Sequence, residues 1–377
     1  MRKICVITLL VCLTLLPLAG SAQTYISIAE MNEHPLERWI QAYETQWRTI
    51  EINVLPKIPQ VNKFPVLKVM RDLRIPDISG LGDGWSGSVS ELSGIFRADH
   101  GYIAKVEQDE KQFPNAKIIS TNYYPPFDMG AIYGKNGYLT LGEMVNRLKY
   151  IMSVLSEDGE EWRYEQPEQV LVNSALDLET GEVLRPDNYY INLIQELHGI
   201  PLFSHVLFYA ENTTIQEIAL SPHILLFHLF TPENVAVSFR KLKVSEVLSD
   251  DVPLCDFEQI QETIEGEILA GHIRKIFDIE LGYTLYNEPG ITTRSNNRET
   301  LKYYAVPVWK VNCYYVESAK KEMRDYTGKD VPERGEIEYT SLIINAQTGE
   351  LFDRFDKQND RGDYQGFLSW DDVGGKP

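Results

Sequence analysis

Cysteine and positive charge are both scarce in this chain. It has four cysteines in 377 residues, and its 36 Lys and Arg residues stand against 55 Asp and Glu, which leaves a net charge of −19. A surface this acidic repels the phosphate backbone of nucleic acids and anionic lipid headgroups. The composition therefore argues against nucleic acid and membrane surfaces as partners.

Long apolar runs are also rare, and the one that stands out lies at the N-terminus. Arg2 and Lys3 precede the apolar run Ile4–Leu18, and small residues follow as far as Ala22. This order is typical of a secretory signal peptide. The run is shorter than the roughly 20 residues that a membrane-spanning helix needs. We therefore predict a signal peptide over residues 1–22, cleaved after Ala22 or, alternatively, after Ser21.

A lipid anchor is not expected. It would need a cysteine at the cleavage point, whereas Cys12 lies within the apolar run. No second apolar segment of spanning length follows, so we expect no stable membrane insertion after cleavage. Removing Arg2 and Lys3 from the 36 basic residues leaves 34 against 55 acidic ones, a net charge of −21. We predict a secreted, extracytoplasmic protein.

Two cysteines, Cys255 and Cys313, remain in the mature chain, and an exported pair could form a disulfide. Alternation along the predicted strand places Cys313 on the same face as Trp309 and Val311, which is a core face. This pattern favours a buried thiol. The disulfide stays open as an alternative, because spacing along the chain does not show whether the two Cα atoms approach each other.

Two helices stand out among many short β-type runs. Thr140 and Glu143 have the spacing of a capping box, and so do Asp256 and Gln259. Apolar residues recur at helical spacing after both boxes. Strands are predicted in the segments 50–54, 64–69, 189–196, 201–209, 225–229, 235–239, 279–286, 303–316 and 339–352. We expect a hairpin turn at residues 198–199, between two of these strands.

The order of these elements predicts an α+β fold with antiparallel sheets and a few packed helices. We divide the mature chain into a β-rich N-terminal domain over 23–135, two α+β regions over 136–250 and 251–355, and a flexible acidic tail over 356–377. Two predicted turns, at 176–184 and 344–352, share a Thr-Gly-Glu sequence in which glycine suits the reversal of the chain. This likeness raises the hypothesis of a weak internal duplication.

Several turns and strands resemble those of one group of proteins. The segments that carry the resemblance are Phe64-Pro65-Val66, Gly199-Ile200-Pro201, Pro307-Val308-Trp309 and Thr348-Gly349-Glu350. They resemble uncharacterised secreted proteins and lipoproteins of gut clostridia, which are Firmicutes, and the C-terminal halves of those proteins look like PepSY and YycI envelope regulatory domains. The resemblance implies that the regions 136–250 and 251–355 are PepSY-like and that the protein restrains a peptidase or a sensor kinase. It carries over no catalytic residue, and the missing lipid-anchor cysteine departs from many of these relatives.

One glycine-rich segment matches a cofactor pattern. Gly82, Gly84 and Gly87 have the spacing of the dinucleotide fingerprint, whose mechanism requires a preceding parallel strand and a following helix. No strong parallel strand precedes them. A surface loop over residues 80–87 is therefore favoured, and no cofactor is expected.

Two segments match the serine–lysine spacing of penicillin-recognising enzymes, which place the serine at the start of a helix. Ser238 and Lys241 extend a strand run, where residues three apart face opposite ways. Ser318 and Lys321 match the same pattern, but the companion motifs are absent. Coincidence is the favoured interpretation, and we assign no catalytic residue.

The histidines and acidic clusters indicate no metal site. The four histidines considered as ligands are His198, His205, His223 and His228, and no two of them have the one-turn helical spacing of a zinc helix. The acidic residues of the tail are Asp353, Asp356, Asp360 and Asp363, which lack the spacing and closing glutamate of a calcium loop. Two further matches, the Arg-Gly-Asp at 361–363 and the acidic pair at 160–161, are expected by chance in so acidic a chain.

The segment Tyr123-Tyr124-Pro125-Pro126-Phe127 is the binding candidate. Its three aromatic side chains could form a ledge that faces a ligand, although aromatic residues more often cover the edge of a core. We single out Tyr123, Tyr124 and Phe127. With 21 tyrosines in the chain, the leading hypothesis is a non-catalytic binding or regulatory protein of the cell envelope, whose partner is an envelope protein or peptide. The alternative is an extracellular hydrolase whose carboxylates or histidines are scattered along the sequence.

Overall fold

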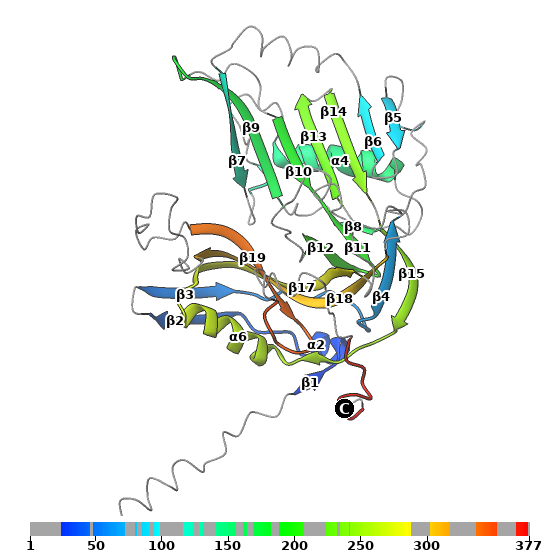
Figure 1. Cartoon of the computed structure of the whole chain (residues 1–377), viewed down its shortest axis with the longest axis vertical. Coiled ribbons are helices and arrows are strands. Elements are labelled where there is room, and N and C mark those ends of the chain that lie inside the picture. Colours follow the sequence, from blue (N-terminus) through cyan, green and yellow to red (C-terminus); the bar gives the residue numbers. More distant parts are fainter. Residues whose placement is uncertain are drawn as a thin grey trace, which may run out of the picture.

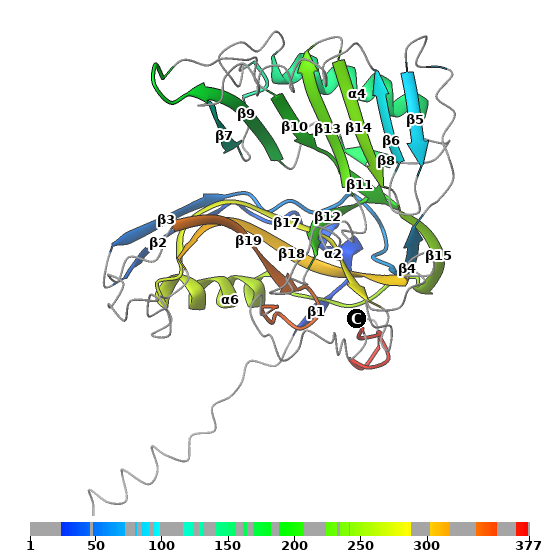
Figure 2. The same ribbon diagram turned by 45° about the horizontal axis from the view of Figure 1, so that its top comes forward.

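A computed structural model describes most of the chain after residue 23. The described residues are 24–45, 48–71, 80, 85–89, 94–98, 116–123, 128–130, 140–155, 161–163, 169–181, 188–206, 224–231, 234–240, 242–287, 302–316, 337–352 and 367–375. The predicted signal peptide lies outside them. Two large sheets form the upper and lower layers in both ribbon views (Figures 1 and 2). The α+β fold class is confirmed.

The described ranges contain three α-helices: α2 (Ile28–Glu33), α4 (Leu141–Leu155) and α6 (Phe257–Leu269). The capping box predicted for α4 is confirmed, because Glu143 N donates to Thr140 Oγ1 at 3.2 Å and Thr140 N donates to Glu143 Oε2 at 2.8 Å. Helix α2 has the same arrangement between Ser27 and Glu30 and was not predicted. None of these helices is long and apolar enough to cross a membrane.

Helix α6 has the predicted N-cap, Asp256, but the prediction of a capping box with Gln259 is wrong. The Asp256 carboxylate accepts from Glu258 N at 3.2 Å. Gln259 does not complete the box: its Oε1 atom is buried and accepts no hydrogen bond. A capping box needs its third residue to reach back to the N-cap backbone. Here Gln259 instead packs close to Gly349, in a turn of the lower sheet.

The upper layer in Figures 1 and 2 is a seven-stranded antiparallel sheet. Its order is β5 (Trp85–Val89), β6 (Gly94–Ala98), β14 (Asn234–Arg240), β13 (Ile224–Thr231), β10 (Asn188–Asn192), β9 (Gln169–Asp177) and β7 (Ala116–Tyr123). Helix α4 lies across one face of this sheet in both views. The apolar side chains that recur along α4 are buried, as the helical spacing predicts.

The lower layer is an eight-stranded sheet, with β19 (Ile337–Asn345) paired to β18. Its order is β15 (Leu242–Ser249), β4 (Val66–Arg71), β18 (Lys302–Val316), β17 (Ile273–Asn287), β12 (Ile200–Val206), β11 (Ile194–Leu197) and β8 (Glu161–Arg163). Helix α6 runs beneath it (Figure 2). The pair β12–β17 is parallel, so the prediction of purely antiparallel sheets is wrong at this pair.

Two smaller antiparallel pairs complete the described strands. The hairpin of β2 (Trp39–Glu44) and β3 (Thr49–Val54) packs against α6 through Trp39, whose ring meets the Phe257 ring edge-on at 6.5 Å. The strands β1 (Tyr25–Ile26) and β16 (Leu254–Cys255) join the start of the described chain to the segment before α6. Both pairs thus bring residues from the N-terminal part of the chain into contact with residues more than 200 positions later in the sequence.

The chain crosses between the two layers within a single predicted strand. Residues 189–196 were expected to form one strand, but the structure breaks it at Leu193 into β10 of the upper sheet and β11 of the lower. The predicted hairpin turn after it is correct, with positive φ at both His198 and Gly199. The lower sheet also takes strands from all three predicted regions 23–135, 136–250 and 251–355.

The main core lies between the lower sheet and α6. Along β17 and β18 alternate side chains enter it, including Leu281, Tyr283, Trp309 and Val311. Cys313 is fully buried on the same face, as predicted. Cys255 is also buried, and the two cysteines are thiols that form no disulfide.

The end of the chain differs from the flexible tail predicted for 356–377. Residues 367–375 are described and dock onto the lower sheet, and Trp370 is buried. An acidic composition predicts a solvated segment. The prediction is wrong for these residues because one indole and two backbone groups find buried polar partners, as detailed below.

The hydroxyl of Tyr283 supports a testable prediction about this core. It donates to Pro65 O at 2.6 Å in a fully buried position, and burial raises the pKa of the hydroxyl well above its usual value. Tyr283→Phe should lower the free energy of unfolding by about 2 kcal/mol, because it leaves a buried carbonyl without this donor. Urea unfolding measures the loss. As a control, Tyr150→Phe removes an exposed hydroxyl that donates to Gly80 O and should change little, since water replaces the bond. Equal losses in the two variants would contradict the argument.

Candidate functional site

The lower sheet has a second face, opposite the core that it forms with α6. Trp309, Val311 and Cys313 of β18 enter that core, so alternation turns Lys310 and Asn312 to the other side. Both are buried all the same, at 4% and 6% exposure. A lysine this deep in a sheet is uncommon and calls for compensating groups.

Strand register gathers these compensating groups into one patch. Glu280 lies directly opposite Lys310, Asp278 opposite Asn312, and Asn312 opposite Ser341 of β19. The Ser341 hydroxyl donates to Asn312 Oδ1 at 2.7 Å. We call these five residues the polar row.

The polar row is nearly closed to solvent but remains charge-balanced. Glu280 and Ser341 are 8% and 7% exposed. At its edge, Lys57 Nζ lies 3.0 Å from Asp278 Oδ1, which makes an ion pair with the half-exposed lysine. Buried charge is costly unless opposite charges and hydrogen bonds compensate it. Together with Lys57 at its edge, the row therefore has two cations against two anions, with an amide and a hydroxyl beside them.

An aromatic end continues the polar row toward solvent. Ile276 and Ile279 both enter the core, so a bulge between them turns Phe277 and Asp278 to the second face. The Phe277 ring meets the Tyr314 ring edge-on at 4.8 Å. Lys275 Nζ lies 4.7 Å from the centre of the Phe277 ring, and Tyr314 is 40% exposed. Lys275, Phe277 and Tyr314 thus place a cation and two aromatic rings together at this end of the face.

The opposite end of the second face is apolar. Lys310 Nζ lies 5.0 Å from the centre of the Phe203 ring, which covers Gly282 on β17. Beyond them is a second apolar cluster formed by Val66, Ile194, Phe203, Val252, Tyr286, Val306, Val308 and Ile343. The face thus changes from apolar packing through buried charge to a pair of aromatic rings, of which Tyr314 is exposed.

A separate titratable cluster lies at the end of α6. His272 Nδ1 is 2.8 Å from Glu267 Oε2, and the Tyr315 hydroxyl donates to the same oxygen at 3.0 Å. The His272 and Tyr315 rings pack with centroids 5.5 Å apart. A carboxylate on Nδ1 orients an imidazole so that Nε2 can exchange a proton with another group. This is the arrangement of a general base, and it is partly open to solvent.

None of these side chains was singled out from the sequence. The alternation of charged and apolar residues in residues 278–282 and 308–312 is the usual pattern of a sheet with one solvated face. It does not show that both faces are covered. Glu267 and His272 are five residues apart across the end of α6, but Tyr315 comes from β18, so no local spacing connects all three.

The predicted binding segment is described only in part. Tyr123 ends β7, where its backbone pairs with Val170 of β9. Tyr124 and Phe127 lie outside the described residues. The hypothesis of an aromatic ledge therefore stays a prediction.

The other sequence motifs are also divided between described and undescribed residues. Gly82 and Gly84 lie outside the described residues, whereas Trp85–Val89 form β5, so the predicted loop ends sooner than expected. Ser238 lies in a strand, β14, as expected, and pairs with Ile95 and Leu226. The remaining members of these motifs fall outside the described residues: Lys241, Ser318, Lys321, Glu160 and the Arg-Gly-Asp at 361–363.

The histidines are dispersed. His198 lies in the exposed β11–β12 turn, His205 lies in β12, and His228 lies in β13 opposite Tyr190 and Ala236. Outside the described residues are His223, Asp353, Asp356, Asp360 and Asp363. Within the described ranges, no three His, Cys, Asp or Glu side chains come together as a metal site would require.

The fold and this face define an α+β protein of two layered sheets, with a mixed-charge patch on the covered side of the larger sheet. No protein-family model matches the chain, and no curated protein matches it. Among solved structures it is similar to an uncharacterised protein from Eubacterium rectale, at 13% identity and a TM-score of 0.45. That match covers 80% of this chain and 90% of the other.

Proposed function

We propose that this chain is an exported, non-catalytic protein that binds and regulates a protein or peptide of the cell envelope. The aromatic end of the lower sheet is its binding surface, and the buried polar row adjoins it. The observation that carries the proposal is the continuity of two paired rings, exposed Tyr314 and half-buried Phe277, with a compensated row of charges.

The chemistry of this surface suits recognition of a polypeptide. Aromatic rings give rigid contact area with little loss of entropy, and they are frequent among the residues that dominate binding energy. Lys275 adds a cation at the aromatic rim, where an acidic group of a partner could approach. Ser341 and Asn312 are buried beside the aromatic end and hydrogen-bond to each other, so they hold the adjoining strands rather than contact a partner.

The sequence adds independent support for the same class of function. A signal peptide over residues 1–22 would direct the chain out of the cytoplasm, where its acidic surface disfavours nucleic acid and anionic lipid. The resemblance to PepSY and YycI domains points to restraint of a peptidase or a sensor kinase. Tyr123, Tyr124 and Phe127 are kept as a second set of candidate anchors.

The test compares partner binding by the parent with that of a Phe277→Ala/Tyr314→Ala double variant. A photo-crosslinking residue at position 275 would identify the partner in envelope extract, and titration with that partner would give its affinity. Loss of two aromatic anchors should weaken binding about 30-fold, which corresponds to roughly 2 kcal/mol. Tyr150→Ala is the matched control, because Tyr150 is an exposed tyrosine on α4, away from this face.

Two outcomes would contradict the proposal. An unchanged affinity of the double variant, with its thermal unfolding intact, would show that Phe277 and Tyr314 are not binding residues. Hydrolysis of a peptide or glycan library by the parent would show that the chain is an enzyme.

A second candidate function, extracellular hydrolysis, is favoured by one observation, the contact of His272 with Glu267. In that case the imidazole would act as a general base on a bound water or on a nucleophile. His272→Gln would then stop turnover. If the parent shows turnover that His272→Gln leaves unchanged, this pair is not the catalytic site.

We also propose that the chain contains an internal duplication, in which each large sheet with its helix is one copy. Two turns support it. Gly181 N donates to Asp177 O at 2.9 Å, and Gly349 N donates to Asn345 O at 2.9 Å, with φ near 70° at both glycines. In the first turn Asp177 Oδ1 also accepts from the backbone amides of Glu179 and Thr180. In the second turn Asn345 Oδ1 accepts in the same way from the amides of Gln347 and Thr348.

A further inference from the structure

Residues 367–375, the docked segment, are attached to the rest of the protein by side chains. The hydrogen bonds described between two backbone groups of this segment all lie within it, for example from Gly375 N to Trp370 O and from Asp372 N to Ser369 O. A compact turn of this kind, held from outside by side chains, contacts the protein as a bound peptide would. Its attachment points to the rest of the protein are therefore side-chain contacts.

Gln347 contacts the backbone of the docked segment. Its Nε2 donates to Leu368 O at 2.8 Å, and its Oε1 accepts from Leu368 N at 3.2 Å. The same amide donates to Pro253 O at 3.0 Å, which fixes its orientation, and the residue is 3% exposed. One buried side-chain amide thus binds both backbone polar groups of a single residue, Leu368, and these two bonds do not involve the Leu368 side chain.

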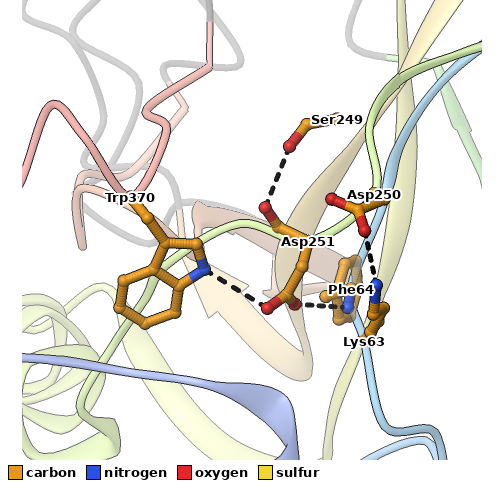
Figure 3. Close-up of polar contacts among 6 residues, drawn as sticks. All are labelled: Lys63, Phe64, Ser249, Asp250, Asp251 and Trp370. Atoms are coloured by element: carbon orange, nitrogen blue, oxygen red, sulfur yellow. Dashed lines mark hydrogen bonds and ion pairs between the residues drawn. The ribbon is translucent and has the colours of Figure 1, made fainter. Parts of the chain in front are cut away.

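Asp251 binds the indole of the docked segment (Figure 3). Its Oδ2 accepts from Trp370 Nε1 at 3.3 Å, while Oδ1 accepts from Phe64 N at 3.0 Å. The Ser249 hydroxyl donates to Asp251 O at 2.9 Å. Asp251 is 6% exposed and Trp370 8%, so this carboxylate selects a tryptophan in a place closed to water.

An apolar contact completes the site. Phe367 packs against the second apolar cluster, which includes Val252 next to Asp251. The site therefore contacts three residues of the segment in order. These contacts are with the Phe367 ring, the Leu368 backbone and the Trp370 indole. Asp371 and Asp372 follow and remain exposed.

We infer that the site of Asp251 and Gln347 is a peptide-recognition site and that the docked segment is its exchangeable ligand, so that the segment of a second copy of this chain binds it in trans. Phe352 and Phe367 pack against the same cluster, yet 14 residues separate them in the sequence. Fully extended, 14 residues span about 50 Å. This length allows the segment to reach another copy without strain on the covalent chain. The inference concerns a site separate from the aromatic end and does not depend on the proposed function.

The test uses a fluorescent peptide of residues 365–375 and the full-length chain. Trp370→Ala removes the indole anchor of the segment in cis but leaves Asp251 and Gln347 in place. The labelled peptide should bind this variant at least tenfold more tightly than it binds the parent, whose own segment competes. A peptide with alanine in place of the tryptophan, and a Trp370→Ala/Gln347→Ala chain, should each lose at least tenfold in affinity.

A second measurement keeps the inference testable if Trp370→Ala does not fold. A protease site placed within residues 353–366 allows the folded chain to be cut with every residue still present. The C-terminal fragment should then exchange with the labelled peptide at equilibrium. If the cut fragment stays bound through gel filtration without exchange, or if folded Trp370→Ala binds the peptide no better than the parent, the segment is a permanent part of the core and the inference fails.

Discussion

Replacing Gly282 by alanine should lower the free energy of unfolding by about 3 kcal/mol, at the upper end of the cost of overpacking a core. A Cβ atom at this position would lie 2.5 Å from Pro201 O and 2.6 Å from a ring carbon of Phe203. The backbone oxygen belongs to β12, which pairs with β17 in the parallel arrangement. Relief of this clash requires one strand to shift, and a shift also disturbs the contact of Lys310 with the Phe203 ring. Urea unfolding followed by circular dichroism measures the loss.

Gly266→Ala provides the matched control. Gly266 lies within α6, and an added Cβ would meet nothing within 4 Å. Alanine should therefore stabilise the helix by about 0.5–1 kcal/mol, because glycine is the poorer helix former. A loss at position 266 as large as that at position 282 would mean that any added methyl group destabilises the protein, and the argument from close approach would be wrong.

Asp251→Ala should destabilise the protein by about 3–4 kcal/mol, because hydrogen bonds to a charged acceptor are lost and two buried donors remain. These donors are Phe64 N and Trp370 Nε1. The Phe64 amide precedes β4, so the effect reaches the lower sheet as well as the docked segment. The variant should also expose Trp370, which would shift its fluorescence to longer wavelength. Equilibrium unfolding and fluorescence of the folded state measure the two effects.

The adjacent residue is the control for this change. Asp250 forms an ion pair with Lys63 in which both side chains are more than half exposed, and such pairs contribute little in water. Asp250→Ala should therefore leave stability nearly unchanged. If Asp250→Ala and Asp251→Ala behave alike, local charge rather than buried hydrogen bonding determines the effect.

Local patterns predicted the elements whose stabilising contacts are close in sequence. The capping box of Thr140 and Glu143 and the apolar spacing that follows identified α4, because both depend on neighbours within one or two turns. Alternation along 303–316 likewise identified the core face of β18, with Cys313 on it. The same logic failed at Gln259, where packing against the turn at Gly349 replaced the capping contact.

Features that depend on distant partners were not visible in the sequence. The break at Leu193 sends one β-type run into two different sheets, and nothing in the run itself marks the change. The parallel pairing of β12 with β17 depends on which strand lies beside β12 after folding. The candidate site also depends on distant partners, since Glu280 and Lys310 lie opposite each other only because β17 pairs with β18 in this register.

The sequence by itself determined the α+β class, the two main helices, the core face of β18 and the acidic surface. These are properties of composition and of periods of two or 3.6 residues, which act over short stretches of chain. Only the tertiary structure decided that Lys310 and Asn312 are buried, that Glu267 contacts His272, and that Trp370 docks on Asp251. The physical reason is that burial and hydrogen bonding of a polar group depend on which distant segments fold against it, and no period in the sequence records that pairing.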